Sequence, residues 1–260
     1  MSDQILFDPK PYNPSTIVEP PTSGFQKPTD GFKVPPVLPD TIWYLAIIKP
    51  HVDSHEIIGP VKAFKHLLPK IQDTVSNSPR AIDKLELLVE IEDMWGEREK
   101  NVEFERSGFE RFIVEGQRGV YTVLKAIREV NKEVFDILPA PVYTVVSVGP
   151  LQHAGAKKDA GTGRDKYSKP KGYAETTELH GSWVDRASAV EVARNVMRGL
   201  LDGEAHAKSA ETWGRDGKGG GILIAMNGTA MWEVKVLYED QAVKRAMEEA
   251  SRGGGGTVWR

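Results

Sequence analysis

The pair Asn227-Gly228 lies between two runs of β-forming residues, Gly221 to Met226 and Ala230 to Val236. Asn and Gly both tolerate the positive φ angles that a two-residue type I′ turn requires. The sequence therefore predicts an antiparallel hairpin with a type I′ turn at this point, and with it a sheet to which other strands can add.

Two continuous apolar runs predict strands that are buried on both faces. They are Ile42 to Ile48 and Val142 to Val148, and each has the length and composition of a core strand. A third strand is predicted from Leu179 to Val184. The first two runs are similar to each other, and each leads to a proline and a histidine-containing loop. This similarity indicates an old internal duplication.

Helical spacing of apolar residues predicts helices between these strands. The predicted segments are Ile57 to Lys70, Pro79 to Trp95, Gln117 to Leu138, a helix capped by Asp185 and a last helix that begins at Asp240. Gly108 to Glu115 predicts a short strand. Together these elements predict an α+β fold, ferredoxin-like or related, with a mixed or antiparallel sheet and helices packed on it. The domain is expected to span residues 41–252, with a division near residue 140.

The segment from Met1 to Asp40 holds nine of the 17 prolines. Proline removes a backbone donor and keeps the preceding residue out of the helical region, so this segment cannot form a helix or a central strand. We expect a disordered arm over residues 1–40. Four glycines from Gly253 to Gly256 predict a flexible tail over residues 253–260.

Composition excludes several classes of function. The chain has no cysteine, so it can have neither disulfides nor thiolate chemistry nor a cysteine-ligated metal. Its net charge is −3, which gives no global field for nucleic acid or an anionic membrane. The first 30 residues lack the basic start and apolar core typical of a signal peptide, and no apolar run has the length needed to cross a bilayer. We therefore expect a soluble cytoplasmic protein without a membrane partner, with the nucleus as an open alternative.

The loop between Leu151 and Tyr173 concentrates positive charge and aromatic residues. Such residues suit a phosphate backbone or an acidic protein surface, so the loop predicts contact with an anionic partner or RNA. A disordered connector explains the same composition, and both readings stay open. The candidate binding residues are Lys157, Lys158, Arg164, Lys166, Tyr167, Lys169 and Lys171.

Other motifs with possible chemistry are weaker. His51, Asp53 and His55 alternate as metal-ligand types, but the sequence anchors no further ligand beside them, so a solvated loop is the preferred interpretation. The acidic run that includes Glu86 and Glu90 is interpreted as the wet face of a helix. No nucleophile elbow, Walker loop or dinucleotide motif occurs, and neither a cofactor nor a metal is expected.

The stretch from Val142 to Glu239 resembles uncharacterised small α+β proteins of filamentous fungi. The features that carry this resemblance are a Val-Tyr-x-Val-Val strand, a basic loop, a strand with central Gly181, an alanine-rich helix and a hairpin that ends in Trp232-Glu233-Val234. The resemblance implies a fold and does not indicate an activity.

Two short fragments resemble nucleoside diphosphate kinase. Ile47-Ile48-Lys49-Pro50 is similar to its first-strand motif, and His180-Gly181-Ser182 is similar to the motif of its phosphorylated histidine. The resemblance implies a phosphotransferase with His180 as nucleophile and Lys49 on phosphate. The sequence departs from the family at His51, Thr177 and Trp183, and it does not place the cations that phosphoryl transfer needs.

The sequence thus favours a non-enzymatic interaction or structural module that contacts a protein partner. The alternative is a divergent phosphotransferase that uses His180. Clustering of cations around His180 would separate the two. The sequence does not determine the identity of the partner or the oligomeric state.

Overall fold

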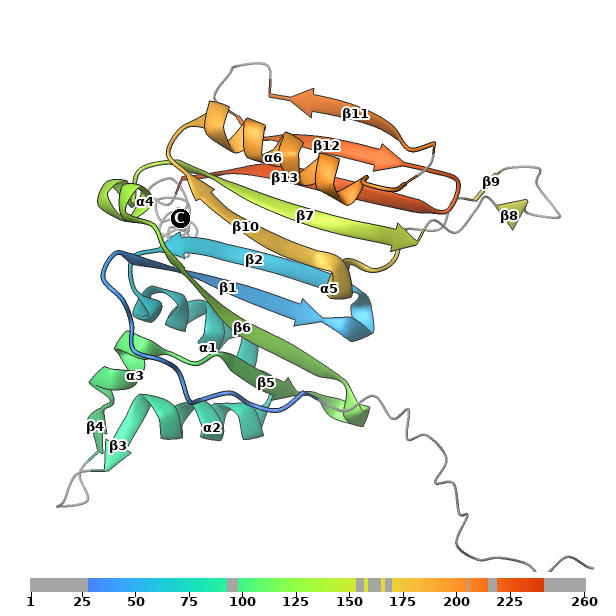
Figure 1. Ribbon diagram of the computed structural model, residues 1–260. Coiled ribbons are helices and arrows are strands. Elements are labelled where there is room, and N and C mark those ends of the chain that lie inside the picture. The colour runs from blue at the N-terminus through green and yellow to red at the C-terminus, as the bar shows by residue number, and fades with distance from the viewer. Residues whose placement is uncertain are drawn as a thin grey trace, which may run out of the picture.

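The chain forms two antiparallel sheets that lie side by side (Figure 1). The computed structural model describes residues 28–92, 98–152, 157–158, 165–166, 170–204, 206–214 and 219–240. Strand β2 of the first sheet is next to strand β10 of the second. The α+β class, with antiparallel sheets and helices packed on them, is therefore confirmed.

The first sheet has the strand order β2-β1-β6-β5. Its strands are β1 (Thr41–Lys49), β2 (Ser54–Val61), β5 (Arg111–Glu115) and β6 (Tyr121–Val130). Helices α1 (Leu68–Val75), α2 (Pro79–Val89) and α3 (Val102–Ser107) accompany it, with single turns at Pro50–Val52, Phe64–Leu67 and Gln117–Gly119. Two short strands, β3 (Glu90–Glu92) and β4 (Arg98–Lys100), pair with each other beyond α2. The helices bury the face of β1 that carries Trp43, Leu45 and Ile47.

The second sheet has the order β10-β7-β13-β12-β11. Its strands are β7 (Val142–Gln152), β10 (Thr177–Trp183), β11 (Lys208–Trp213), β12 (Gly221–Met226) and β13 (Ala230–Glu239). Helix α6 (Arg186–Leu200) packs on it through Ala189, Ala193 and Met197. Asp185 caps this helix as predicted, since its Oδ1 accepts a hydrogen bond from Ser188 N at 2.8 Å. The remaining elements are α4 (Lys132–Ile137), α5 (Tyr173–Thr176), β8 (Lys157–Lys158) and β9 (Asp165–Lys166).

The two sheets share one topology. In each sheet the first strand in sequence lies in the interior, and the second strand pairs with its outer side. Helices follow in the chain, and two further strands then pair on the inner side of the first strand. The order β2-β1-β6-β5 therefore corresponds to β10-β7-β13-β12. Strand β11 is an addition to the second sheet. The second sheet begins at Val142. The repeated order agrees with the duplication that the similar apolar runs indicate, and it differs from the βαββαβ order of the ferredoxin-like fold.

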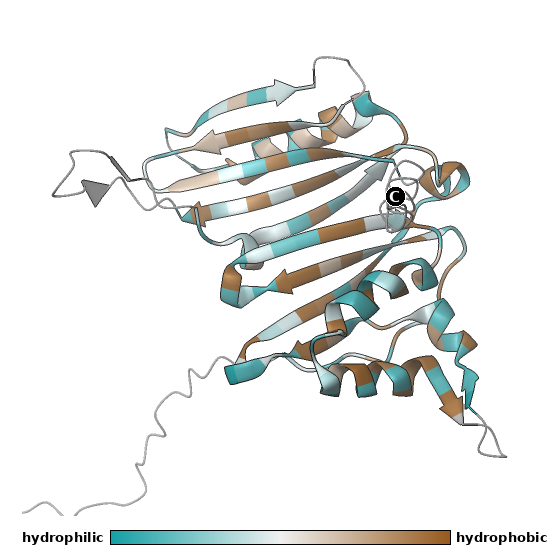
Figure 2. Cartoon of the chain, turned by 180° about the vertical axis from the view of Figure 1, so that it is seen from behind, coloured by the Kyte–Doolittle hydropathy of each residue, from teal (hydrophilic) through white to brown (hydrophobic). Residues whose placement is uncertain are grey.

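The helices of the two sheets lie on opposite sides of the molecule. In Figure 1, α6 lies in front of its sheet and α1 lies behind the other; Figure 2 shows the reverse from the far side. The opposite face of β1 is covered as well, because Ile42 and Tyr44 pack against Val134 of α4.

Two predicted helices are wrong. Residues 57–61 of the segment predicted as a helix from Ile57 to Lys70 belong to β2, and the α-helix begins at Leu68. In the segment predicted as a helix from Gln117 to Leu138, Tyr121–Val130 forms β6, and the α-helix is confined to Lys132–Ile137. Apolar residues in this segment fit a helical period, but its β-branched and aromatic residues also fit a strand, and pairing with both β1 and β5 decides the outcome.

The hairpin at Asn227-Gly228 is confirmed, but its type I′ turn is wrong. Neither residue has a positive φ. Instead, Asn227 Oδ1 accepts hydrogen bonds from the backbone N–H groups of Thr229 (2.9 Å) and Ala230 (2.8 Å). Asn227 therefore closes the turn with its side chain, which is the alternative role that asparagine has in turns.

A buried chain of hydroxyl groups joins the two sheets. The hydroxyl of Tyr44 in β1 donates to Glu129 Oε2 at 2.6 Å and is hydrogen-bonded to Ser182 Oγ of β10 at 2.7 Å. Ser182 Oγ lies 2.7 Å from Thr144 Oγ1 of β7. Asn131 continues the chain by donating to Glu129 Oε1 and to the backbone oxygen of Ser182. Burial and the carboxylate of Glu129 raise the pKa of Tyr44, so its hydroxyl remains protonated.

Two glycines make room for this chain. Gly59 in β2 has φ +121°, and a Cβ there would lie 2.6 Å from the carbonyl oxygen of Trp43 and 3.2 Å from the Tyr44 ring. Gly181 in β10 has φ +119°, and a Cβ there would lie 3.2 Å from Glu129 Oε1. Both positions need glycine for conformation as well as for space.

The end of the proline-rich segment belongs to the folded part. Gly31 N donates to Arg111 O at 2.8 Å and Arg111 N donates to Gly31 O at 3.2 Å, so the segment pairs with the outer edge of β5. The Phe32 ring contacts the Phe112 ring, with centroids 5.9 Å apart, and Val37 packs on the core. Of the expected arm over residues 1–40, residues 28–40 therefore lie against the first sheet, and residues 1–27 lie outside the described residues.

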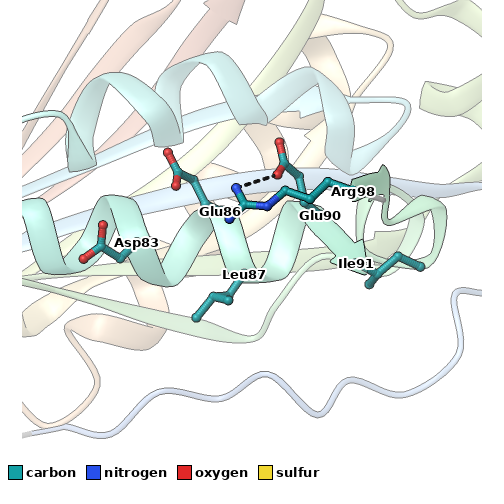
Figure 3. Close-up of a pocket in the computed structure, with 6 residues that line it drawn as sticks. All are labelled: Asp83, Glu86, Leu87, Glu90, Ile91 and Arg98. Carbon is teal, nitrogen blue, oxygen red and sulfur yellow. Dashed lines mark hydrogen bonds and ion pairs between the residues drawn. The ribbon is translucent and has the colours of Figure 1, made fainter. Parts of the chain in front are cut away.

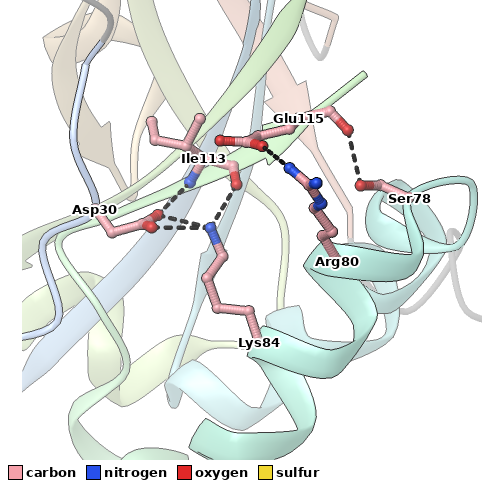
Figure 4. A network of polar contacts seen from close by, with 6 residues as sticks. All are labelled: Asp30, Ser78, Arg80, Lys84, Ile113 and Glu115. Carbon is pink, nitrogen blue, oxygen red and sulfur yellow. Dashed lines mark hydrogen bonds and ion pairs between the residues drawn. The ribbon is translucent and has the colours of Figure 1, made fainter. Parts of the chain in front are cut away.

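Side chains complete the coverage of the β5 edge (Figure 4). Asp30 Oδ1 accepts from Ile113 N at 2.7 Å, and Lys84 Nζ donates to Ile113 O at 2.7 Å. Lys84 also pairs with Asp30 Oδ2 at 2.8 Å. Ser78 Oγ donates to Glu115 O at 2.7 Å. The outward-facing polar groups of this edge are thus bonded within the molecule.

Truncation tests which part of residues 1–40 stabilises the fold. Removal of residues 1–27 is expected to leave the melting temperature unchanged. Removal of residues 1–40 should lower the free energy of unfolding by about 2–4 kcal/mol, because apolar contacts and the hydrogen bonds of Asp30 are lost. The longer deletion should also promote self-association through the uncovered β5 edge, as measured by sedimentation. Equal stability of both truncated chains would contradict this account.

Tyr44→Phe tests the junction between the sheets. It removes the hydroxyl that connects Glu129 to Ser182 and should lower the free energy of unfolding by roughly 1–3 kcal/mol, as expected for a broken buried network. Tyr121→Phe is the matched control, since the Tyr121 hydroxyl has no hydrogen-bond partner among the described residues, and denaturant titration should show no change for it. Equal effects of both substitutions on the free energy of unfolding would contradict the claim that the Tyr44 hydroxyl stabilises the junction.

Candidate functional site

The predicted basic loop is only partly described. Lys157, Lys158 and Lys166 lie in the small β8–β9 ladder, where Lys157 is opposite Lys166. Lys171 is exposed and pairs with Gln152 through the backbone. The other candidate residues, Arg164, Tyr167 and Lys169, lie outside the described residues. Contact with an anionic partner through this loop therefore stays a prediction.

The end of that loop is anchored to the first sheet. Asp53 Oδ2 accepts a hydrogen bond from Gly172 N at 2.7 Å, and its Oδ1 accepts one from Ala174 N at 3.0 Å. Burial alone would raise the pKa of Asp53, but these backbone donors outweigh it and lower the pKa. Asp53 thus fixes α5 in place. The described residues contain no group of three His, Asp or Glu side chains that could hold a metal ion.

A buried carboxylate holds the other side of α5. The Tyr173 hydroxyl donates to Glu233 Oε1 at 3.0 Å, and Lys235 Nζ lies 2.6 Å from Glu233 Oε2. Burial, followed by the interaction with Glu233, raises the pKa of Tyr173 to about 12. Tyr173 is therefore a structural contact at the end of the loop, because its ring and hydroxyl are engaged within the molecule.

His180 lies in β10 and bonds to a buried serine. Its Nε2 is 2.7 Å from Ser147 Oγ. Burial lowers the pKa of His180, and the nearby carboxylate of Glu178 only partly opposes this effect. Within the described part of the chain, no lysine or arginine makes a hydrogen bond or ion pair with His180. The phosphotransferase alternative stays a prediction that this environment does not favour.

Lys49 lies elsewhere, in a polar cleft of about 390 Å³ at the end of β1. The alternation that places Trp43, Leu45 and Ile47 on the helix face continues to Lys49, where the core ends. The other lining residues are His51, Glu56, Lys70, Asp73, Thr74, Ser76, Asn77 and Thr122. Its two lysines are matched by two carboxylates, so the cleft does not offer the excess of cations that a transferring phosphoryl group requires.

The most unusual surface lies along α2 and its continuation (Figure 3). A hollow of about 670 Å³ is lined there by Asp83, Glu86, Leu87, Glu90, Ile91 and Arg98, which we call the α2 surface. The Leu87 side chain is 79% exposed and Ile91 is 48% exposed. Two large aliphatic side chains thus lie in solvent among charged groups.

The carboxylates of the α2 surface are poorly compensated. Glu86 lies in the last turn of α2 and Glu90 follows directly after its end, and both line the hollow. Arg98 pairs with Glu90 at 3.4 Å, whereas Asp83 and Glu86 have no cationic partner among the described residues. The sequence predicts that this acidic run is the wet face of a helix that extends from Pro79 to Trp95. Helix α2 ends at Val89, which turns Ile91 outward. The available sequence signal was Leu87, an aliphatic residue on the acidic face.

No family model, no curated protein and no solved structure matches the chain. The resemblance of Val142 to Glu239 to fungal α+β proteins therefore stays a prediction. Among the described residues, no helix combines the length and the apolar character needed to cross a membrane.

Two half-buried histidines predict a pH dependence of stability. Burial lowers the pKa of His55 and of His180 in the folded chain. The unfolded chain binds protons below about pH 6.5 and the folded chain does so only at lower pH, so stability is full above this pH and falls below it. Denaturant titrations from pH 7.5 to 5.5 should show this fall, and His180→Gln should reduce its slope. His51→Gln, at an exposed position, is the control; an equal slope in the wild type and His180→Gln would refute the assignment.

Proposed function

We propose that the protein is an intracellular interaction module, and that its α2 surface receives a basic amphipathic segment of a partner protein. The observation that carries the proposal is the exposure of Leu87 and Ile91 beside the uncompensated carboxylates of Asp83 and Glu86. Aliphatic side chains that line an exposed hollow are typical of interaction sites. Their acidic surroundings specify the charge of the partner.

The physical argument has two parts. Burial of an exposed leucine in an interface yields about 1.5–3 kcal/mol. Cations of a partner would pair with Asp83 and Glu86, and this contribution would speed association and weaken with salt. The lack of cysteine supports the intracellular setting, and we place the module in the cytoplasm, with the nucleus as the alternative.

Site-specific crosslinking in native lysate tests the proposal. A photo-reactive phenylalanine derivative replaces Leu87, and the same derivative at Val130, which is 60% exposed in another region, is the control. We expect position 87 to capture a protein segment rich in Lys or Arg and apolar residues, identified by mass spectrometry. A captured segment without basic residues, or identical products from both positions, would refute the proposal.

A synthetic peptide of the captured segment then tests the energetics. Leu87→Ser should weaken its binding about tenfold, in line with the loss of one buried leucine. Asp83→Asn with Glu86→Gln should flatten the dependence of affinity on salt. Glu191→Gln, an exposed carboxylate on α6, is the control and should leave affinity and salt dependence unchanged.

A further inference from the structure

The outer edge of the second sheet is open, in contrast to that of the first. Strand β11 pairs with β12 on one side, and none of the described residues makes a hydrogen bond to its other side. All its residues except Trp213 are exposed. An edge strand with free N–H and C=O groups is a template for another strand. The corresponding groups of β5 are bonded to Gly31, Asp30, Lys84 and Ser78.

A groove runs beside this open edge. It has a volume of about 480 Å³ and lies between α6 and β11. Met197, Leu201 and Leu223 form its apolar part, and Arg194 and Arg198 come from α6. An extended segment on the edge of β11 would place every second side chain on the face of the sheet that carries this groove.

The charges beside the groove are mainly positive. Arg194 is bonded to Glu211 of β11 by two hydrogen bonds of 3.1 and 3.0 Å. This pair shows that residues 209, 211 and 213 face α6. Arg198 bonds only to the amide oxygen of Asn195 among the described residues, at 3.1 Å, so its charge is not matched by a carboxylate. Lys208 on the other face adds a second unmatched cation within the described region.

We propose that β11 binds an extended acidic peptide segment by strand addition, with alternate acidic side chains beside Arg198. The backbone of the segment would complete the hydrogen bonds of β11, and its side chains would enter the groove. This mode separates the two sources of recognition: the main chain supplies affinity and the alternate side chains supply specificity. The site is distinct from the α2 surface, which selects the opposite charge.

Fluorescence anisotropy with defined peptides tests this proposal. The probe is a labelled heptapeptide of alternating valine and glutamate, which favours the extended conformation. Its first control has lysine in place of glutamate, and its second has methylated backbone nitrogens at alternate positions, which removes donors. We expect the glutamate peptide to bind at least about tenfold more tightly than either control. Equal binding of the methylated peptide would overturn strand addition, and no binding of the glutamate peptide up to millimolar concentration would overturn the site.

Variants of the full chain locate the site. Arg198→Gln should weaken binding of the glutamate peptide roughly tenfold, whereas Arg106→Gln, an exposed arginine of α3, should leave it unchanged. Slower hydrogen exchange of the β11 amides on addition of the peptide would support direct pairing. An unchanged affinity of Arg198→Gln would contradict the proposed specificity. Concentration-dependent dimerisation that excludes the peptide would show that a second copy, and not an acidic segment, occupies the edge.

Discussion

The hydroxyl of Tyr44 belongs to a buried polar chain that holds the two sheets against each other. It connects Glu129 of the first sheet to Ser182 and Thr144 of the second. Buried polar groups are costly when they lack partners, so a chain that satisfies each member favours one arrangement over others. Gly59 and Gly181 supply the room that this arrangement needs. The α2 surface and β11 lie at opposite ends of the molecule (Figure 1), and this junction keeps them at a fixed separation.

Much of the fold could be predicted because the strongest signals are local. The apolar runs at Ile42 and Val142, the hairpin and the cap at Asp185 follow from residue type and spacing alone. The segment from Tyr121 to Val130 could not be assigned in this way, since its apolar residues fit a helical and an extended period. Its conformation is decided by pairing with β1 and β5, which are distant in the chain. Likewise, the side chain of Asn227 replaces the backbone conformation that its pair with glycine suggests.

The candidate sites were less accessible from the sequence, for physical reasons. Leu87 stands among acidic residues in the sequence, but only the three-dimensional packing shows that its side chain faces solvent. The open edge of β11 depends on strand order, and the sequence analysis did not recognise β11 as a strand. The motifs at Lys49 and His180 are short, and the fold places them in different sheets with different neighbours. Residue types alone indicate which reactions a side chain can take part in. They do not indicate which side chains the fold brings together.

The closure of the β5 edge has a consequence for stoichiometry. A sheet protein polymerises when each copy offers two free edges, because every added strand then presents a new edge to the next copy. Here residues 28–40 and the side chains of α2 occupy one outer edge of the described structure, and β11 leaves the other exposed. Growth from such a molecule stops after a single addition. If β11 accepts a strand from a second copy, residues 28–40 limit the assembly to two copies, because they occupy the edge at which a third copy would add.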